Sequence, residues 1–252
     1  MIDRRVSIAR DVYFSPATDQ GCIVLNLERS SVLSLNQIAA FMFSKLAQAA
    51  NGLTRDEFVG VIKREFEEVE VMRIGKGVDD LLARLEQTGT IQTEENVSAA
   101  VRRGDVRANV ALRLSRCVKY LLRPLLYVKA YTIAALVLLL TAEVLRKLRG
   151  FRAIHDSVAH WNITGQAQAD ETILANACAA VNRACTWHPK RSLCLQRASV
   201  LVCLLRSLGF PAEMIIGVHK MPFYGHAWAE VDGKVVNDHA NAQKFFHVLN
   251  RC

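Results

Sequence analysis

The sequence predicts an α+β protein built from two domains. Its 252 residues exceed the usual length of one domain, and 51% of them are hydrophobic, which is enough for a sizeable core. The hydrophobic pattern alternates as in strands near the N-terminus, then follows a helical period, and returns to strands after residue 211. Only 13 glycines and 5 prolines occur, which excludes a disordered or fibrous chain.

The first domain, residues 1–95, is predicted to be a small winged-helix-like unit of three strands and three helices. The strands are predicted at residues 12–14, 22–28 and 31–35. The helices are predicted at residues 37–50, 55–66 and 76–87. Asn36 is a suitable N-cap, Thr54 opens a capping box, and Gly89 ends the third helix. The polar, aperiodic run that follows marks the domain boundary.

The second domain, residues 96–252, begins with a basic helical segment, residues 102–152. This segment carries 12 basic and 2 acidic residues, whereas residues 1–100 carry 11 basic and 15 acidic ones. Such a local patch suits an acidic peptide, a nucleotide or an anionic surface. Its apolar run lacks a charge only over residues 130–142, fewer than the roughly 20 residues that a membrane span needs. We therefore expect a helix buried between the domains, with membrane contact through residues 124–145 as the alternative.

The remainder of the second domain reads as two helices followed by a strand and a hairpin. The helices are predicted at residues 169–185 and 193–208, and the strands at residues 212–219, 226–231 and 234–238. The chain opens without the apolar run of a signal peptide, and its seven cysteines lack framework spacing. Both observations predict a cytoplasmic protein with free thiols.

Three side chains in this half suit nucleophilic acyl chemistry. Cys194 opens a helix, where the positive end of the helix dipole favours a thiolate. His226 begins one strand of the hairpin, and Asp238 ends the next. A thiol, an imidazole that takes and gives a proton, and a carboxylate that orients the imidazole form a complete nucleophilic triad. Cys203, deep in the same apolar helix, is predicted to be structural.

The hairpin allows two registers. With the two-residue turn Asp232-Gly233, Asp238 falls on the strand face opposite to His226. With a three-residue loop over residues 231–233, Asp238 lies directly opposite His226, and Glu230 pairs with a lysine of opposite charge. We choose the second register, and Asn237 and His239 are the competing neighbours if this register is wrong.

A metal site is the other interpretation of the cysteines and histidines. Its candidate ligands are Cys185, His188, His219, His226 and His239. The chain lacks the paired spacings that structural zinc sites usually have, so we expect neither a metal nor a cofactor.

The C-terminal stretch CLQRASVLVCLLRSLGFPAEMIIGV, followed by GHAWAEVDGKVVND, resembles the lasso peptide biosynthesis B proteins. These are leader peptidases of the transglutaminase-like, papain-like superfamily. The resemblance covers roughly residues 100–252 and implies a papain/transglutaminase-like domain, with helices packed on a small antiparallel sheet. It also implies that Cys194, His226 and Asp238 are catalytic. The chain departs from papain-like hydrolases in one respect, because the run WHPKRSL before the cysteine lacks the glutamine that helps hold the oxyanion.

The N-terminal unit resembles the PqqD-like RiPP recognition element through LNLERSSVLSLNQIAAFMFSKL and DDLLARLEQTG. In that family, the leader peptide adds a strand to the edge of the third strand and lies against the third helix. The resemblance therefore implies leader-binding residues Val32, Leu33, Ser34, Leu35, Val78, Leu81, Leu82 and Leu85. An edge strand supplies main-chain hydrogen bonds to such a peptide. The alternative is that these apolar residues only fill the core of the domain.

Together these observations predict a cysteine peptidase that removes the leader peptide from a lasso-peptide precursor. The resemblance further implies an asparagine-synthetase-like cyclase as a partner. An acyl or glutaminyl transferase with the same triad, a non-catalytic leader-binding scaffold and a winged-helix regulator are the alternatives. The net charge of −4 over residues 1–100 argues against DNA binding, so we expect no nucleic-acid partner.

Overall fold

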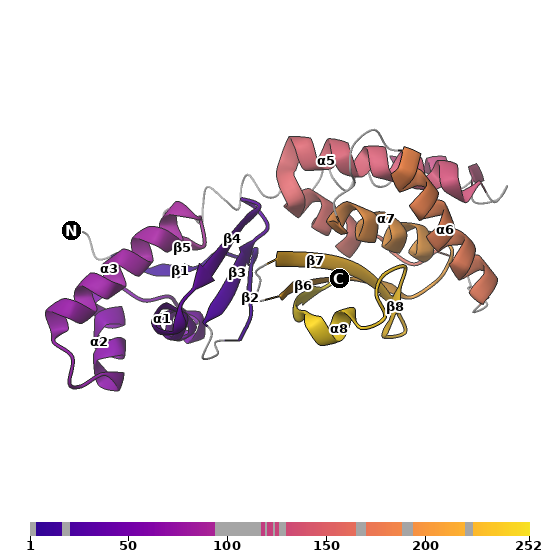
Figure 1. Ribbon diagram of the computed structural model, residues 1–252. Helices are drawn as coiled ribbons and strands as arrows, with labels where there is room; N and C mark the ends of the chain where they lie inside the picture. Colours follow the sequence, from indigo (N-terminus) through magenta and orange to yellow (C-terminus); the bar gives the residue numbers. More distant parts are fainter. Residues whose placement is uncertain are drawn as a thin grey trace. The chain divides into compact units, whose positions relative to one another are not determined.

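The computed structural model describes residues 4–16, 21–93, 117–118, 120–122, 124–125, 130–164, 170–187, 194–219 and 224–252. The chain divides into two compact units, residues 1–105 and 106–252 (Figure 1). Both units combine helices with small antiparallel sheets, which confirms the predicted α+β class. The predicted boundary between residues 95 and 96 lies outside the described residues and stays a prediction.

The first unit contains the three predicted strands as one antiparallel sheet. Its strands lie in the order β2 (Val12–Phe14), β3 (Cys22–Asn26) and β4 (Ser31–Leu35), so β4 is an edge of this sheet. A second ribbon, in which β1 (Val6–Ile8) pairs with β5 (Ile91–Thr93), was not predicted. The winged-helix likeness of the unit stays a prediction.

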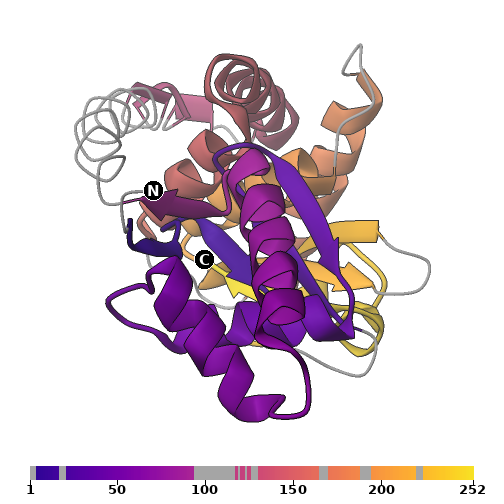
Figure 2. The same ribbon diagram turned by 90° about the vertical axis from the view of Figure 1, so that its left-hand side faces the viewer.

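Three helices complete this unit, namely α1 (Gln37–Gln48), α2 (Arg55–Glu65) and α3 (Val71–Gln87). The side chain of Asn36 accepts the Ala39 N–H at 2.9 Å, and Thr54 forms the predicted capping box. Helix α3 begins five residues before the predicted start. Figure 2 shows α3 in front of the strands, and its buried apolar face shares one core with α1, α2 and the sheet.

The second unit places three helices on one side of a four-stranded antiparallel sheet (Figure 1). The helices are α5 (Tyr131–Ala159), α6 (Glu171–Trp187) and α7 (Cys194–Ser207). The sheet order is β8 (Lys234–Val236), β7 (Tyr224–Val231), β6 (Ala212–His219) and β9 (His247–Arg251). Helix α7 packs against β6 and β7, while α5 and α6 pack against α7. A short helix, α8 (Ala242–Phe245), precedes β9.

Helix α5 bends at a single residue. Gly150 has φ 71° and ψ −165°, a conformation that is essentially restricted to glycine. The two halves of α5 therefore run in different directions although they are continuous in sequence.

The expected buried helix is buried on one face only. The inward residues of α5, such as Ala134 and Leu138, are buried, while Ile133, Leu140 and Leu148 are exposed. In the described part of the chain, no helix is both long and apolar enough to cross a membrane.

Candidate active site

Cys194, His226 and Asp238 line one pocket, at the N-terminus of α7 and the nearby ends of β7 and β8. The Nε2 atom of His226 lies 3.0 Å from Oδ2 of Asp238. The same imidazole is hydrogen-bonded to the thiol of Cys194. Since Asp238 occupies Nε2, the other ring nitrogen, Nδ1, is the one left for the sulfur. The imidazole is thus bracketed by a thiol and a carboxylate.

The pKa of Cys194 is lowered below its ordinary value. Burial acts to raise this pKa, but the hydrogen bond with His226, the backbone N–H groups of Ala227 and Leu195, and the charge of His226 outweigh the effect of burial. The sulfur is half-buried rather than enclosed in an apolar core. This is the environment of a reactive cysteine, because the thiolate is the nucleophilic form.

The pKa of His226 is raised. Its hydrogen bond with Cys194 is the largest cause, burial opposes the shift, and the charge of Asp238 and the hydrogen bond to it add to the shift. A raised pKa on the imidazole and a lowered pKa on the thiol both favour a thiolate–imidazolium pair at neutral pH.

The hairpin adopts the register that we rejected. Val231 pairs with Lys234 and Glu230 with Val235, so the turn is the two-residue Asp232-Gly233. Asp232 and Gly233 have φ 50° and 73°, as a type I′ turn requires. The expected charge pair between Glu230 and a lysine therefore predicted the wrong register. The two-residue left-handed turn is preferred because it matches the twist of the strands better than a three-residue loop.

Asp238 reaches His226 in spite of this register, because β8 ends at Val236, two residues before the predicted end. Asn237 is left-handed, with φ 59°, and turns the chain back toward β7. Asp238 is then held by a second hydrogen bond, in which its Oδ1 accepts the N–H of His239 at 2.7 Å.

A ring cluster and a buried carboxylate support the imidazole from behind. The His226 ring lies 5.2 Å from the Phe246 ring and 6.1 Å from the Trp228 ring, measured between centroids. The indole Nε1 of Trp228 donates to Oε1 of Glu230 at 2.7 Å. Glu230 is 1% exposed and also accepts hydrogen bonds from Gln243 and Arg251, each at 2.7 Å. The sequence did not reveal the role of this carboxylate, since two of its three partners, Gln243 and Arg251, lie on α8 and β9.

The candidate metal ligands are described by the structure except for His188. Across the described ranges, no group of three or more His, Cys, Asp or Glu side chains is placed to hold a metal ion. His188, a candidate ligand and a candidate oxyanion donor, lies outside these ranges. All seven cysteines are free thiols.

The structure separates the predicted leader-binding residues into two groups. Five of them are buried in the core of the first unit, namely Leu33, Leu35, Val78, Leu81 and Leu85. Their side chains fill the core of this unit, whereas an added strand would pair with the main chain of β4, so the leader-binding assignment stays a prediction. Val32 and Ser34 on the edge strand β4 are exposed, and Leu82 on α3 is partly buried.

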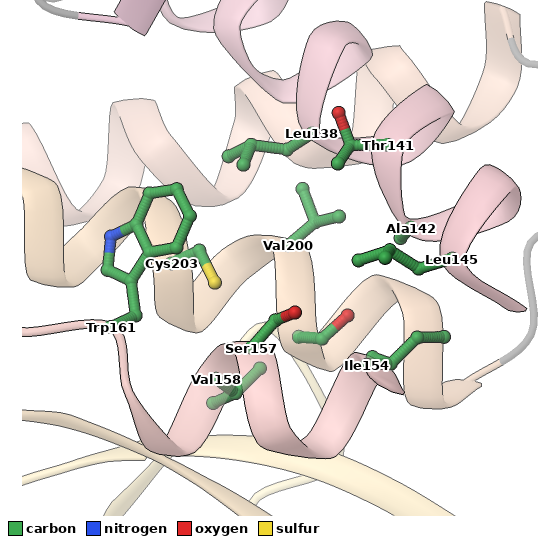
Figure 3. A pocket seen from close by; sticks show the side chains of 11 residues that line it. Leu138, Thr141, Ala142, Leu145, Ile154, Ser157, Val158, Trp161, Val200 and Cys203 are labelled. Atoms are coloured by element: carbon green, nitrogen blue, oxygen red, sulfur yellow. The ribbon is translucent and has the colours of Figure 1, made fainter. Parts of the chain in front are cut away.

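A second pocket lies between α5 and α7 (Figure 3). Its hydroxyl groups are satisfied within their own helices, as for Thr141, which donates to the carbonyl of Val137 at 2.8 Å. The sulfur of Cys203 lies among apolar side chains there, in agreement with its predicted structural role (Figure 3). The cavity of about 30 Å³ has room for about one water molecule, so we regard it as a packing gap.

Comparisons with known proteins agree with this division of the chain. Residues 21–91 match the family model of coenzyme PQQ synthesis protein D (PqqD), and residues 136–251 match that of the transglutaminase-like superfamily. The microcin J25-processing protein McjB of Escherichia coli is 39% identical over 59 residues, which are 23% of this chain and 28% of McjB. No solved structure is significantly similar to the chain. Residues 21–91 are thus similar to PqqD and residues 136–251 to the transglutaminase-like superfamily, which are the two parts expected from the resemblance to lasso peptide biosynthesis B proteins.

Proposed function

We propose that this protein is a cysteine peptidase that cuts the leader peptide from a ribosomally made lasso-peptide precursor. The observation that carries the proposal is the imidazole of His226, which is hydrogen-bonded to the Cys194 thiol and lies 3.0 Å from the Asp238 carboxylate. The similarity to a microcin J25-processing protein supports a precursor peptide as the substrate.

In the acylation step, the thiolate of Cys194 attacks the carbonyl carbon of the last leader residue. The imidazolium of His226 gives its proton to the departing nitrogen, the C–N bond breaks, and the core peptide leaves with a free amine. The leader remains as a thioester on the sulfur.

In the deacylation step, His226 takes a proton from water, and the resulting hydroxide attacks the thioester carbonyl. The C–S bond breaks, the leader leaves as a carboxylate, and the thiolate–imidazolium pair is restored. Asp238 orients the ring and stabilises its charged form in both steps.

The first unit would hold the leader at the edge of β4. The main chain of this strand has a strand partner on only one side within the described residues, since β3 is its neighbour in the sheet. Val32 is 45% exposed and is available for an apolar contact with an added strand. Arg84 of α3 donates to the Ser34 carbonyl at 3.3 Å, so an added strand would compete with this hydrogen bond.

Fusion of the two units raises the effective concentration of the cut site near the thiol, so weak contacts at the cut site itself suffice. The free amine of the released core is the group that an asparagine-synthetase-like cyclase would join to a carboxylate. We therefore propose such a cyclase as the partner that acts next.

The test is to incubate the purified protein with a candidate lasso-peptide precursor and to measure the product masses. Cys194→Ala should abolish cleavage but still bind the leader. Cys117→Ala is the matched control, since this cysteine is exposed and lies outside the pocket. Cleavage by Cys194→Ala would refute the mechanism.

The product masses also distinguish the peptidase from a transferase and from a non-catalytic scaffold. Incorporation of an added amine instead of water would identify a transferase. Normal maturation of the precursor with Cys194→Ala would identify a non-catalytic scaffold.

A further inference from the structure

Asn237 is held in an unfavourable state directly beside the candidate triad. Its φ of 59° is left-handed, which side chains other than glycine rarely adopt. Its Nδ2 atom is buried, and the described residues supply no hydrogen-bond partner for it. Both features cost free energy, and such costs persist where the surrounding structure over-determines a functional position.

Two hydrogen bonds from neighbouring helices hold Asn237 in place. Arg197 of α7 donates from Nη2 to the Asn237 carbonyl at 2.7 Å. Asn182 of α6 donates from Nδ2 to the Asn237 side-chain oxygen at 2.8 Å. Arg197 follows Cys194 by three residues on the same helix, so one element carries both the thiol and the group that fixes Asn237.

The conformation of Asn237 decides where Asp238 points. The observed two-residue turn, continued as a regular strand, would place Asp238 on the face opposite to His226. The left-handed residue interrupts the strand, and Asp238 instead comes within 3.0 Å of the imidazole.

We propose that Asn237, held by Arg197 and Asn182, is the positioning residue that sets Asp238 against His226. The inference rests on the proposed function, because it assigns these residues to the orientation of the same triad. We call these three side chains the Asn237 clamp, and we infer that they act through Asp238.

The clamp can be tested without a precursor, by measuring the rate at which iodoacetamide alkylates Cys194 as a function of pH. Trypsin cuts after Arg191 and Arg197, so Cys194 is the single cysteine in the peptide of residues 192–197. Mass spectrometry of this peptide therefore reports Cys194 separately from the other six cysteines.

In Asn237→Ala, we expect Asp238 to move away from His226, so that the imidazolium is less stable and the thiol is protonated over a wider pH range. At a pH below the pKa of the wild-type thiol, where the rate follows the small thiolate fraction, alkylation should slow about tenfold, which corresponds to a rise of about one unit in the pKa of the thiol. Asn237→Gly should recover most of this loss, because glycine adopts the left-handed conformation freely and keeps the carbonyl that Arg197 binds. An unchanged rate in Asn237→Ala, or an equal loss in Asn237→Gly, would overturn the proposal.

The matched control is Asp232→Ala. Asp232 is also left-handed, with φ 50°, and lies in the turn of the same hairpin outside the pocket. Alanine there imposes similar backbone strain without touching the clamp, so alkylation of Cys194 should stay at the wild-type rate. If Asp232→Ala slowed the alkylation of Cys194 as much as Asn237→Ala does, the cause would be general backbone strain, and the proposal would be overturned.

A second pair of variants tests the helix side. Asn182→Ala should slow alkylation by about twofold to fivefold, which is less than one pKa unit. Arg183→Ala removes the neighbouring side chain, which bonds Thr132 instead, and should have no effect. Equal rates in the two variants would remove Asn182 from the clamp.

Cleavage of the precursor, measured in parallel, separates this inference from the proposed function. A wild-type protein that shows the predicted alkylation pattern but leaves the precursor intact would refute the peptidase and keep the clamp. Cleavage by the wild type and by Asn237→Ala with equal kcat would keep the peptidase and refute the clamp.

Discussion

Gly217 on β6 is the position where a single added methyl group should be most disruptive to the sheet behind His226. A Cβ there would lie 2.8 Å and 2.9 Å from two ring carbons of Trp228 and 2.9 Å from the Cβ of Phe246. The Phe246 contact involves an atom next to the main chain, so the clash cannot be relieved by a rotamer change alone. Overpacking of this kind costs about 1–3 kcal/mol.

Gly217→Ala is best compared with Gly225→Ala in urea. At Gly225 an added Cβ would approach no atom more closely than 4.0 Å, so this variant should stay within about 0.5 kcal/mol of the wild type. All three tryptophans lie in the second unit, so their fluorescence follows the unfolding of that unit. A loss of about 2 kcal/mol moves the midpoint by about 1 M urea, if the slope is about 2 kcal/mol per M. Equal midpoints for the wild type and Gly217→Ala would refute the packing argument.

Four further predictions concern individual residues and their contacts. Alkylation of Cys194 should continue well below pH 9.0, the ordinary pKa of its thiol, and His226→Ala should move the midpoint of the alkylation profile toward that value. Arg251→Met should destabilise the second unit by about 2 kcal/mol in urea at pH 7, because it leaves the buried Glu230 carboxylate with one partner fewer. Burial acts to raise the pKa of Glu230, but hydrogen bonds from Gln243, Trp228 and Arg251 outweigh it, so the pKa is lowered. The ionised Glu230 therefore contributes to the unfolding free energy above pH 4.5, and this contribution is lost as the pH falls through the folded-state pKa. An unfolding free energy that stays constant from pH 7 to pH 3 would contradict this prediction. Asn26→Ala should lower the unfolding free energy of the first unit by about 2 kcal/mol, because Nδ2 of Asn26 donates to the carbonyl of Gly89 at 2.7 Å. Circular dichroism measures this loss, and a variant as stable as the wild type would show that water replaces the donor at no cost.

The identity of the candidate triad was accessible from the sequence, whereas the path by which it assembles was not. Residue type, position on the predicted elements and the family resemblance selected Cys194, His226 and Asp238 as candidates. The register was predicted wrongly, since the charge pair at Glu230 was weighed above the turn preference of Asp232-Gly233. Asparagine adopts the left-handed conformation more often than most residues, but the sequence does not predict it at Asn237, because the groups that hold this residue come from α6 and α7.

The missed strands and the burial of several proposed leader-binding residues have a common origin in tertiary contacts. Strands β1, β5 and β9 are short or partly polar, and each is defined by a partner far away in sequence. The helices were predicted more closely, since caps such as Thr54 act within a few residues. The resemblance marked whole segments of β4 and α3 for leader binding, but it did not separate outward side chains such as Val32 from core residues such as Leu85.

The bend at Gly150 makes this position intolerant of substitution for a reason unrelated to catalysis. Any residue with a Cβ would disfavour the observed φ and ψ, and the helix would tend to run straight through residue 150. If α5 were straight, its last turns would move away from the residues that they now contact. One of these residues is Arg206, which donates to the Val158 carbonyl at 2.6 Å. Random mutagenesis with selection for soluble protein should therefore leave residue 150 unchanged while it freely varies the exposed positions on either side.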